Sequence, residues 1–243
     1  MGIKIDEVHV KVENFWHEMQ ERIASYDLLG HPFYQAWAAG ELSREDLRQY
    51  ATDYYHHVAA FPTYLGQLYA RLEDGELRRA VLRNLCDEEG VEGGTQSPPH
   101  CELWLDFAEG MGASRDQARR SQPVEEVRGL IAHFRRLASE ASAAEALAAF
   151  YAYESQVPRV AKEKATGLRE RYGADARATR YFTLHIGADV YHSRVWKEEL
   201  SKLIASQPEL AERALAAAEN TARALWRALD GIERERQARC VAA

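Results

Sequence analysis

The amino-acid sequence predicts an all-α protein, a bundle of seven to nine helices in a single domain over residues 1–243. Apolar residues recur at the spacing of a helix face along nearly the whole chain, and no stretch alternates convincingly as a half-buried strand does. The 7 prolines and 15 glycines are few for a loop-rich all-β fold of 243 residues. Because the chain contains neither an internal repeat nor a low-complexity linker, one domain is the simplest organisation.

Each expected element is delimited by residues that begin or end helices. Ser43 caps a long helix, with Asp46 at the position where a capping box usually has Glu or Gln. Pro62 and Pro158 lie inside helical stretches, where a proline lacks the N–H that the helix needs, so each is expected to bend its helix. The sequence GVEGGTQSPP, at residues 90–99, is the clearest loop. The expected helices, with a short segment at 31–40 after the first, cover residues 6–25, 43–72, 76–89, 100–112, 124–140, 142–172, 180–206 and 208 into the tail.

Charge and cysteine usage exclude several classes of function. The formal charge of −7 gives no reason to expect a nucleic-acid partner, which requires a clustered basic surface. Cys86, Cys101 and Cys240 form no CxxC pair, which favours free thiols in a reducing compartment. The N-terminus lacks the apolar core of a signal peptide, and no run of about 18 apolar residues is present to span a membrane. A cytoplasmic protein without membrane contact is expected.

His185, Asp189 and His192 are the strongest local signal. Their i, i+4, i+7 spacing puts all three on one face of a helix. Two imidazoles and a carboxylate from one helix face can hold one metal ion or a pair of ions. The ordinary alternative is a solvated polar stripe, but Phe182 and Trp196 lie close to this face and keep it near the core. A buried row of ionisable groups needs a charge partner, and a metal supplies one.

Three further candidate ligands lie on other segments. Glu154 interrupts the aromatic stretch AFYAYESQVP, where it needs a compensating charge from a metal or from an arginine such as Arg159. Glu88 ends one expected helix and His100 begins the next, so the two could supply a second half-site, although adjacent acids at a helix end are usually solvated. Six ligands from four helical segments is how carboxylate-bridged two-metal sites are assembled in bundles.

The predicted ligand set also indicates the chemistry. Oxygen and nitrogen ligands without thiolate suit iron or manganese better than a structural zinc site. A site of this kind with open positions can bind and activate dioxygen. Redox chemistry is therefore the primary prediction, and metal-assisted hydrolysis is its rival.

Five runs, in order along about residues 15–200, resemble the haem-oxygenase-like dimetal oxidases, and within them the group of the chlamydial protein associating with death domains (CADD) and its bacterial homologues. Relatives in this fold include the pyrroloquinoline quinone synthesis protein C and the TenA-type thiaminases, which do not share the ligand set. The resemblance implies a haem-oxygenase-like helical bundle. The runs are HPFYQAW, GELSREDLRQYATDYYHHVAAFPTYL, NLCDEE with a following H-x-x-LW, YAYESQVPRVAKEK and YFTLHIGADVYHSR.

The resemblance implies the same metal ligands that the spacing suggests, with one departure. The family's spacing from glutamate to histidine is usually about seven residues, whereas Glu88 and His100 are twelve apart through the longer 90–99 loop. Loops between helices tolerate such insertions, yet Glu89 or Glu92 could take the place of Glu88. The six implied metal ligands are Glu88, His100, Glu154, His185, Asp189 and His192.

The resemblance further implies a reaction that consumes the protein. CADD-like members are implicated in making 4-aminobenzoate for folate, with one of their own tyrosines as the aromatic ring and a lysine as the amine donor. The matching residues are Tyr34 and Lys164; Tyr50 matches a second tyrosine, and Tyr153 lies beside Glu154. Lys164 follows Glu154 by ten residues, so the two are expected on one helix face, about 15 Å apart along the axis. By composition alone, Tyr34 and Tyr50 would be ordinary core aromatics.

Cofactors and partners follow from the same resemblance. The implied enzyme is a non-haem dimetal oxidoreductase with an Fe/Fe or Mn/Fe pair, dioxygen as co-substrate and an external reductant. Its reaction would be single-turnover. A homodimer is expected, with an unidentified electron donor.

The sequence is also compatible with four alternative functions. A dimetal oxidase of this fold could act on a separate amino acid or fatty acid. A metal-free oxidase of the pyrroloquinoline quinone synthase type would bind its substrate through arginine and histidine. A TenA-like hydrolase would need a cysteine nucleophile, for which Cys86 and Cys101 are the available thiols. A protein that binds death domains would need no metal at all.

Overall fold

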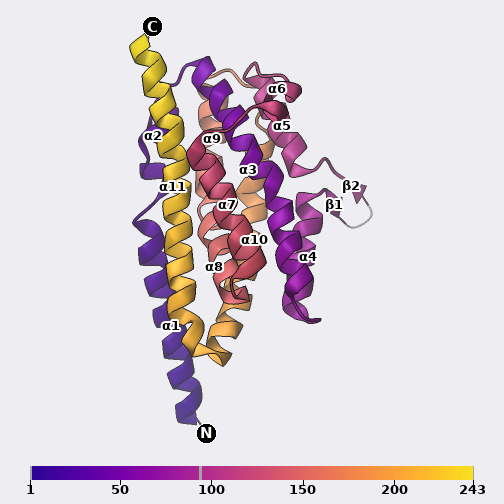
Figure 1. The fold of residues 1–243 in the computed structure, drawn as a ribbon, viewed down its shortest axis with the longest axis vertical. Helices are drawn as coiled ribbons and strands as arrows, with labels where there is room; N and C mark the ends of the chain where they lie inside the picture. The colour runs from indigo at the N-terminus through magenta and orange to yellow at the C-terminus, as the bar shows by residue number, and fades with distance from the viewer. Residues whose placement is uncertain (1, 93–94, 243) are drawn as a thin grey trace.

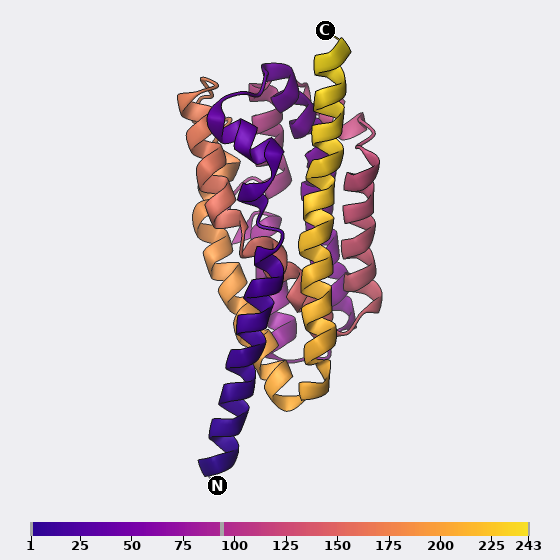
Figure 2. The same cartoon turned by 90° about the vertical axis from the view of Figure 1, so that its left-hand side faces the viewer.

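The computed structural model describes residues 2–92 and 95–242, with side chains except at 2–9, 92, 95, 96 and 242. It is an elongated helical bundle in which α11 runs along the long axis, beside α1 (Figures 1 and 2). No described helix is both long enough and apolar enough to cross a membrane. The α-helices are α1 (Gly2–Ala24), α2 (Pro32–Ala39), α3 (Arg44–Arg71), α4 (Glu76–Glu88), α5 (His100–Gly110), α6 (Arg115–Arg120), α7 (Glu125–Glu140), α8 (Ala143–Glu154), α9 (Val157–Glu170), α10 (Arg180–Ser206) and α11 (Ala211–Ala242).

The all-α class is confirmed, with more helices than the sequence suggested. The described residues form eleven α-helices instead of seven to nine, because the segment at 31–40 and the connector at 115–120 are helical and the stretch at 142–172 is two helices. Two short 3-10 turns, η1 (Leu28–Gly30) and η2 (Pro208–Leu210), precede α2 and α11.

The two internal prolines behave differently. Pro158 does not bend a continuous helix: α8 ends at Glu154, and α9 begins at Val157. Pro158 therefore lies in the first turn of α9, where its missing N–H forfeits no intrahelical hydrogen bond. Pro62 lies inside α3, which continues through it. The expected kink at Pro158 was wrong because the break falls two residues earlier.

Capping boxes begin three of the helices. The Ser43 hydroxyl accepts from the Asp46 N–H at 3.1 Å, and the Asp46 carboxylate accepts from the Ser43 N–H at 2.9 Å, as the sequence predicted for α3. Ser114 and Ser142 form the same reciprocal pair at α6 and α8. Each such cap contributes about 1 kcal/mol and fixes where its helix starts.

The stretch at 90–99, expected as a loop, contains a short antiparallel ribbon of β1 (Val91–Glu92) and β2 (Thr95–Gln96), which projects from the bundle in Figure 1. Its base is narrow, because the Ser97 N–H donates to the Gly90 carbonyl at 3.1 Å. Gly90 has a φ of +69°, and a Cβ there would lie 2.1 Å from the Ser97 carbonyl oxygen. Only glycine fits this closure, which brings the end of α4 back to the start of α5.

The core is centred on α8, whose sequence AAEALAAFYAYE is apolar almost all round. A helix of this kind must be covered on every side, and α7, α10 and α11 pack against it. Ala144 and every residue from Ala146 to Glu154 are buried. The burial of α8 places the carboxylate of Glu154 inside the protein, where it faces α10.

Candidate metal centre

The six side chains that the sequence proposed as metal ligands come together inside the bundle. Each is at most 5% exposed. Glu88 and His100 lie at the facing ends of α4 and α5, and Glu154 is the last residue of α8. The i, i+4, i+7 face of α10 contributes the remaining three, His185, Asp189 and His192.

Four helical segments bring the side chains into two groups that could each hold a metal ion and that have one residue, Glu88, in common. In the first, ligand atoms of Glu88, His100 and His185 lie within 4.8 Å of one another. In the second, ligand atoms of Glu88, Glu154 and His192 do so. Asp189 lies beside the second group, with its Oδ1 3.4 Å from Nδ1 of His192. Glu88 is therefore the residue that would contribute to both groups if two ions were held here.

Hydrogen bonds outside the ligand set fix which ring nitrogens are available. Nδ1 of His185 donates to the Tyr181 carbonyl at 2.7 Å, which leaves Nε2 free to ligate. Nε2 of His192 lies 2.8 Å from Oδ2 of Asp87, so Nδ1 is the nitrogen turned toward Asp189 and Glu154. Such partners orient metal-bound imidazoles. Sequence reasoning missed Asp87.

Several buried polar atoms in this site lack a hydrogen-bond partner within the described part of the chain, as expected of atoms that serve as metal ligands. Among the described residues, Nδ1 of His100, Oδ2 of Asp189 and Nδ1 of His192 are buried and make no hydrogen bond. Oε2 of Glu88 is 3.0 Å from Nδ1 of His100, but the two are not aligned as a hydrogen bond. Unsatisfied buried groups are costly, and cations at this point would satisfy all three. The all-oxygen-and-nitrogen donor set suits iron or manganese.

The positions of Arg159 and Glu89 bear on two alternatives to the proposed ligand set. Arg159 forms its ion pair with Asp27, at 3.0 Å, and therefore does not compensate the charge of Glu154. The Glu154 carboxylate instead accepts hydrogen bonds from Trp196 Nε1 and, at 3.4 Å, from Asn84 Nδ2. Glu89 is exposed, and the side chain of Glu92 lies outside the described part of the chain. Among the acids whose side chains are described at the end of α4, Glu88 is therefore the one that joins both groups.

Burial and close charges shift the pKa values of the ligands. Burial raises the pKa of Glu154 to about 8. Burial opposes protonation of His192, but the nearby carboxylates of Asp189 and Asp87 prevail and raise its pKa to about 11. Burial alone would raise the pKa of Glu88, whereas the neighbouring His100 brings it below the ordinary value. Without a metal, protons on Glu154 and His192 balance part of the buried negative charge.

Metal affinity is accordingly expected to rise with pH. A bound cation must displace the protons of Glu154 and His192, and that of His100 wherever its raised pKa keeps it protonated. Below about pH 8 at least two protons therefore leave per chain, and affinity rises roughly 100-fold or more per pH unit. Above about pH 8, where Glu154 is ionised, the slope falls to about one proton. Calorimetric titration with Mn²⁺ in buffers of different ionisation enthalpy measures the released protons. An affinity that does not change from about pH 6 to 8 would contradict the assignment.

A second cluster brings together the predicted tyrosines and lysine. Lys164 is 6% exposed, and its Nζ donates to Tyr34 Oη at 2.7 Å and to Tyr50 Oη. The two phenol oxygens are 3.2 Å apart. Nζ also lies over the ring faces of both tyrosines, 4.2 and 4.7 Å from their centroids. Burial lowers the pKa of Lys164 well below its ordinary value, which favours a neutral, nucleophilic amine.

This arrangement corrects the expected relation of Lys164 to Glu154. The two do not share one helix face, because α8 and α9 are separate helices. The position of Lys164 is set by tertiary contacts with α2 and α3. Gly167, one turn further along α9, allows close packing, since a Cβ there would lie 2.9 Å from the Trp37 ring.

Aromatic contacts join the metal centre to the tyrosine–lysine cluster. The ring of His185 stacks on Tyr181, with centroids 4.0 Å apart. Tyr181 meets Trp104 edge-on at 4.8 Å, and Trp104 lies 5.7 Å from Tyr50. These aromatic contacts therefore run without interruption from the proposed ligand His185 to Tyr50, whose hydroxyl contacts that of Tyr34.

A cavity of about 30 Å³ lies between the two clusters. Tyr153 and Tyr181 line it near the metal centre, and Tyr34 and Lys164 line it at the other cluster. The cavity lies beside α8 and α10, the helices that bear Glu154 and His185, because Tyr153 and Tyr181 belong to these two helices. Its volume holds about one water-sized molecule.

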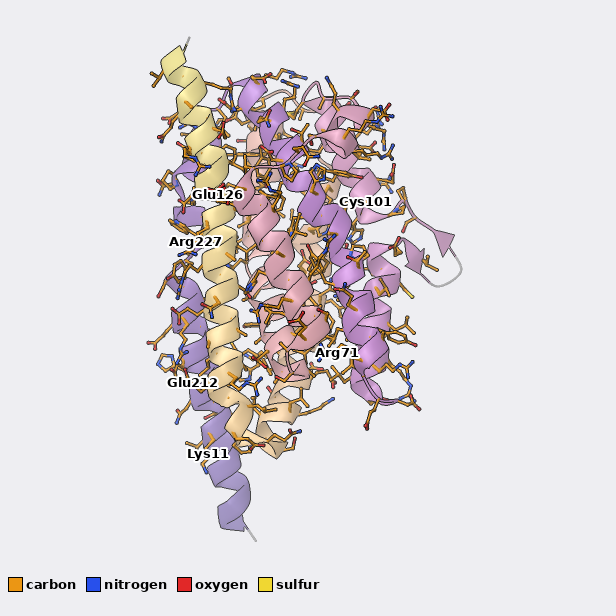
Figure 3. The ribbon with its side chains drawn as sticks, viewed as in Figure 1. Lys11, Arg71, Cys101, Glu126, Glu212 and Arg227 are labelled. Carbon is orange, nitrogen blue, oxygen red and sulfur yellow. The ribbon has the colours of Figure 1, made fainter. Side chains whose placement is uncertain are left out.

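Cys86 and Cys101 flank the metal centre but do not form a hydrolase-like site. Cys101, labelled in Figure 3, lies at the start of α5 and is partly exposed. Burial raises the pKa of its thiol, and the acidic Glu102 and Glu89 raise it further. A nucleophilic cysteine needs the opposite environment, with a lowered pKa.

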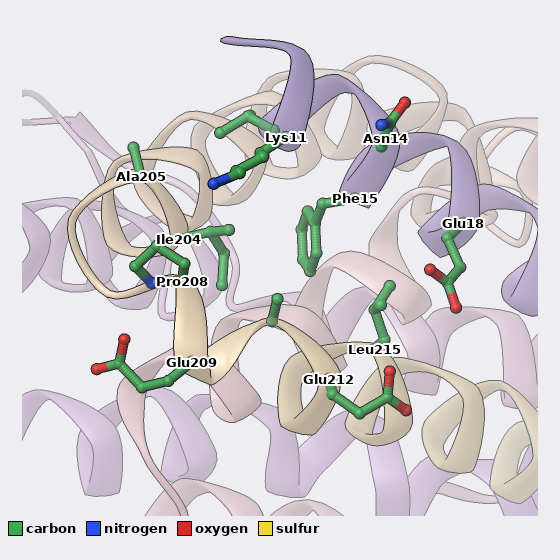
Figure 4. A pocket seen from close by; sticks show the side chains of 12 residues that line it. Lys11, Asn14, Phe15, Glu18, Ile204, Ala205, Pro208, Glu209, Glu212 and Leu215 are labelled. Atoms are coloured by element: carbon green, nitrogen blue, oxygen red, sulfur yellow. The ribbon is translucent and has the colours of Figure 1, made fainter. Parts of the chain in front are cut away.

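A larger surface groove lies away from both clusters. It has a volume of about 560 Å³ and is lined by α1, the end of α10 and the start of α11, as Figure 4 shows. Phe15, Ile204 and Leu215 contribute its apolar surface. None of the sequence-predicted site residues lines this groove.

Comparison with known proteins places the two clusters in context. A family model described as iron-containing redox enzyme matches residues 48–226. The chain is 40% identical to a 4-aminobenzoate synthase of Chlamydia pneumoniae, over 78% of this chain and 83% of that protein. It is 37% identical to a 4-aminobenzoate synthase of Nitrosomonas europaea, over 90% of each. A pyrroloquinoline-quinone synthase of Acidiphilium cryptum is 29% identical, over 83% of this chain and 81% of that protein. Among solved structures, a TenA homologue from Pseudomonas syringae has a TM-score of 0.73 at 16% identity, covering 91% of this chain and 92% of that one.

Proposed function

This chain belongs to the haem-oxygenase-like family of iron-containing redox enzymes, and on that premise we propose that it makes 4-aminobenzoate from its own Tyr34, with Lys164 as the amine donor. The reaction would need dioxygen and an external reductant, and would yield at most about one product per chain. When bound, an Fe/Fe or Mn/Fe pair would supply the activation of dioxygen. Glu88, His100, Glu154, His185, Asp189 and His192 would hold it.

The contact of Lys164 with Tyr34 carries the proposal. An amine and a phenol oxygen held 2.7 Å apart are the two groups that must be exchanged if a tyrosine ring is to become an aminobenzene. A lysine buried among aromatic rings is costly to maintain, and no carboxylate contributes to its lowered pKa. A group held in place in this way has a high effective concentration toward its neighbour.

The product defines the bonds that change. The Cα–Cβ bond of Tyr34 breaks, and Cβ is oxidised from a methylene to a carboxylate. At the opposite ring carbon, the phenol C–O bond breaks, its oxygen leaves as water, and a C–N bond to the Lys164 nitrogen forms. The bond from that nitrogen to lysine Cε breaks as Cε is oxidised to an aldehyde, and Cα of residue 34 takes up hydrogen and stays in the chain as glycine. Dioxygen is the oxidant and the external reductant supplies the remaining electrons. Tyr50, hydrogen-bonded to both groups, can hold or pass the proton that leaves Nζ or Oη.

The size of the cavity favours an internal substrate over a separate one. Pockets for small molecules are typically about 300–1,000 Å³. The cavity lined by Tyr34 and Lys164 is about 30 Å³, which accommodates dioxygen but not an amino acid or a fatty acid. A reaction on a residue already in place needs no larger space.

Isotope labelling tests the proposal directly. Protein labelled with ¹³C in the tyrosine ring and ¹⁵N in the lysine side chain is loaded with Fe²⁺ and Mn²⁺ and exposed to air with a reductant. Product mass is expected to carry both labels, and the intact chain is expected to lose the corresponding mass. Unlabelled 4-aminobenzoate, or many product molecules per chain, would instead indicate a separate substrate. Restored growth of a cell lacking 4-aminobenzoate synthesis is the matching test in vivo.

A further inference from the structure

His31, the first residue of the HPFYQAW run, is a buried polar residue that the reaction itself does not use. It is 1% exposed and is the N-cap of α2, the eight-residue helix that carries Tyr34. Its Nδ1 accepts the backbone N–H of Phe33 at 3.1 Å. Its Nε2 lies 3.2 Å from Oδ1 of Asp230, on α11. The imidazole therefore joins the start of α2 to the C-terminal helix, 199 residues away in sequence.

These two contacts specify one tautomer of the ring. Nδ1 can accept from Phe33 only when it carries no proton, so the proton must lie on Nε2. A carboxylate only accepts, and Asp230 therefore favours this tautomer. With the proton on Nδ1, two donors would face each other at the first turn of α2, and the cap would be lost. Trp226, edge-on to the ring at 4.8 Å, holds its plane.

We propose that His31, in the tautomer selected by Asp230, is a positioning residue that sets the place of Tyr34 against Lys164. The inference rests on the proposed function and deepens it, since it names what holds the consumed tyrosine. Tyr34 is in the first turn of α2, and its own N–H donates to the His31 carbonyl at 2.9 Å. An eight-residue helix has little stability of its own, so its cap decides where its first turn lies.

The surroundings of His31 suit this role near neutral pH. Burial lowers its pKa, and the carboxylates of Asp230 and Glu233 oppose the shift. The ring is accordingly neutral, as an acceptor at Nδ1 requires. The chain from Asp230 through His31 to the Phe33 N–H is then a fixed sequence of hydrogen bonds that ends one residue before Tyr34.

Amide exchange and ring ¹⁵N shifts test the proposal on the full-length, metal-loaded protein. Wild-type His31 is expected to show the Nε2–H tautomer. Asp230→Ala is expected to mix the tautomers, to speed exchange of the Phe33 amide by about tenfold, and to lower the yield of 4-aminobenzoate per bound metal. Glu235→Ala is the matched control. Glu235 is an exposed carboxylate on the same helix and is not among the charges that shift the pKa of His31, so this variant is expected to change neither the tautomer, nor Phe33 exchange, nor the yield.

A second pair of variants separates positioning from general loss of stability. His31→Ala is expected to reproduce the loss, whereas His31→Asn, whose side chain can cap α2 without reaching Asp230, is expected to restore Phe33 protection and most of the yield. In the His31→Asn background, Asp230→Ala is expected to have no further effect. An additional loss there, or Phe33 exchange unchanged by Asp230→Ala, would overturn the proposal. Wild-type protein without product would count against the proposed function alone, because tautomer and exchange are read independently of product.

Discussion

Tyr34→Phe is expected to abolish formation of 4-aminobenzoate while leaving the bound metal unchanged. The substitution removes one oxygen, the atom that accepts from Lys164 at 2.7 Å, and Tyr34 is not among the proposed ligands. Phenylalanine fills nearly the same buried volume, so α2 is expected to remain folded. Mass spectrometry of product after exposure to air, with metal analysis of the same sample, measures both effects.

Tyr64→Phe is the matched control for this experiment. Tyr64 is fully buried and stacks on Phe134, and its hydroxyl makes no hydrogen bond among the described residues. Its removal is expected to leave the yield unchanged. Wild-type yield from Tyr34→Phe would show that another ring is consumed, or that the substrate is separate.

The companion change at Lys164 is best made to methionine. Arginine would place a permanent charge where burial lowers the pKa of lysine, so that any loss would mix chemistry with desolvation. Methionine keeps the length and is neutral. Lys164→Met is expected to leave metal binding intact and to prevent appearance of lysine-derived nitrogen in the product.

Glu88→Ala is expected to lower the metal content from about two ions per chain to near zero, because Glu88 belongs to both ligand groups. His185→Ala removes a ligand from the first group only and is expected to leave about one ion. A lower metal content in Glu88→Ala than in His185→Ala would indicate that Glu88 contributes to both ion sites. Metal analysis after growth with iron and manganese, together with circular dichroism to verify folding, measures it.

Glu89→Ala is the control, since Glu89 neighbours Glu88 in sequence but is exposed. It is expected to retain both ions. Equal loss in Glu88→Ala and His185→Ala would contradict a site with one bridging carboxylate and would indicate that the ligands form a single unit.

The sequence predicted best what lies within one helix. His185, Asp189 and His192 share a face of α10 because the helical repeat fixes their directions, without any knowledge of the rest of the chain. The class of fold followed in the same way from the apolar repeat. The break after Glu154 was missed, since Ser155 and Gln156 carry no strong breaker signal and only Pro158 was visible as a proline.

What could not be predicted depends on tertiary contacts. Consecutive residues of a helix point about 100° apart, so the side chains of Asp87, Glu88 and Glu89 cannot all face the same point. Which of them faces α10 depends on how α4 packs, and the partly exposed Asp87 gave no sequence signal for its contact with His192. Likewise, the pairing of Lys164 with Tyr34 spans 130 residues and followed from resemblance, with no local pattern to indicate it.

The closure at Gly90 and Ser97 has a consequence for how this part of the chain can evolve. The Gly90–Ser97 hydrogen bond ties the base of the ribbon and brings α4 back to α5, so the ribbon's length need not alter the separation of Glu88 and His100. Doubling the length of such a loop costs only about 0.6 kcal/mol in closure entropy. Insertions between these two ligands are therefore expected to cost little stability, and the twelve-residue spacing is compatible with an unchanged centre. Residue spacing across this ribbon is for that reason a poor criterion for recognising related proteins, whereas a glycine directly after the acidic run is a better one.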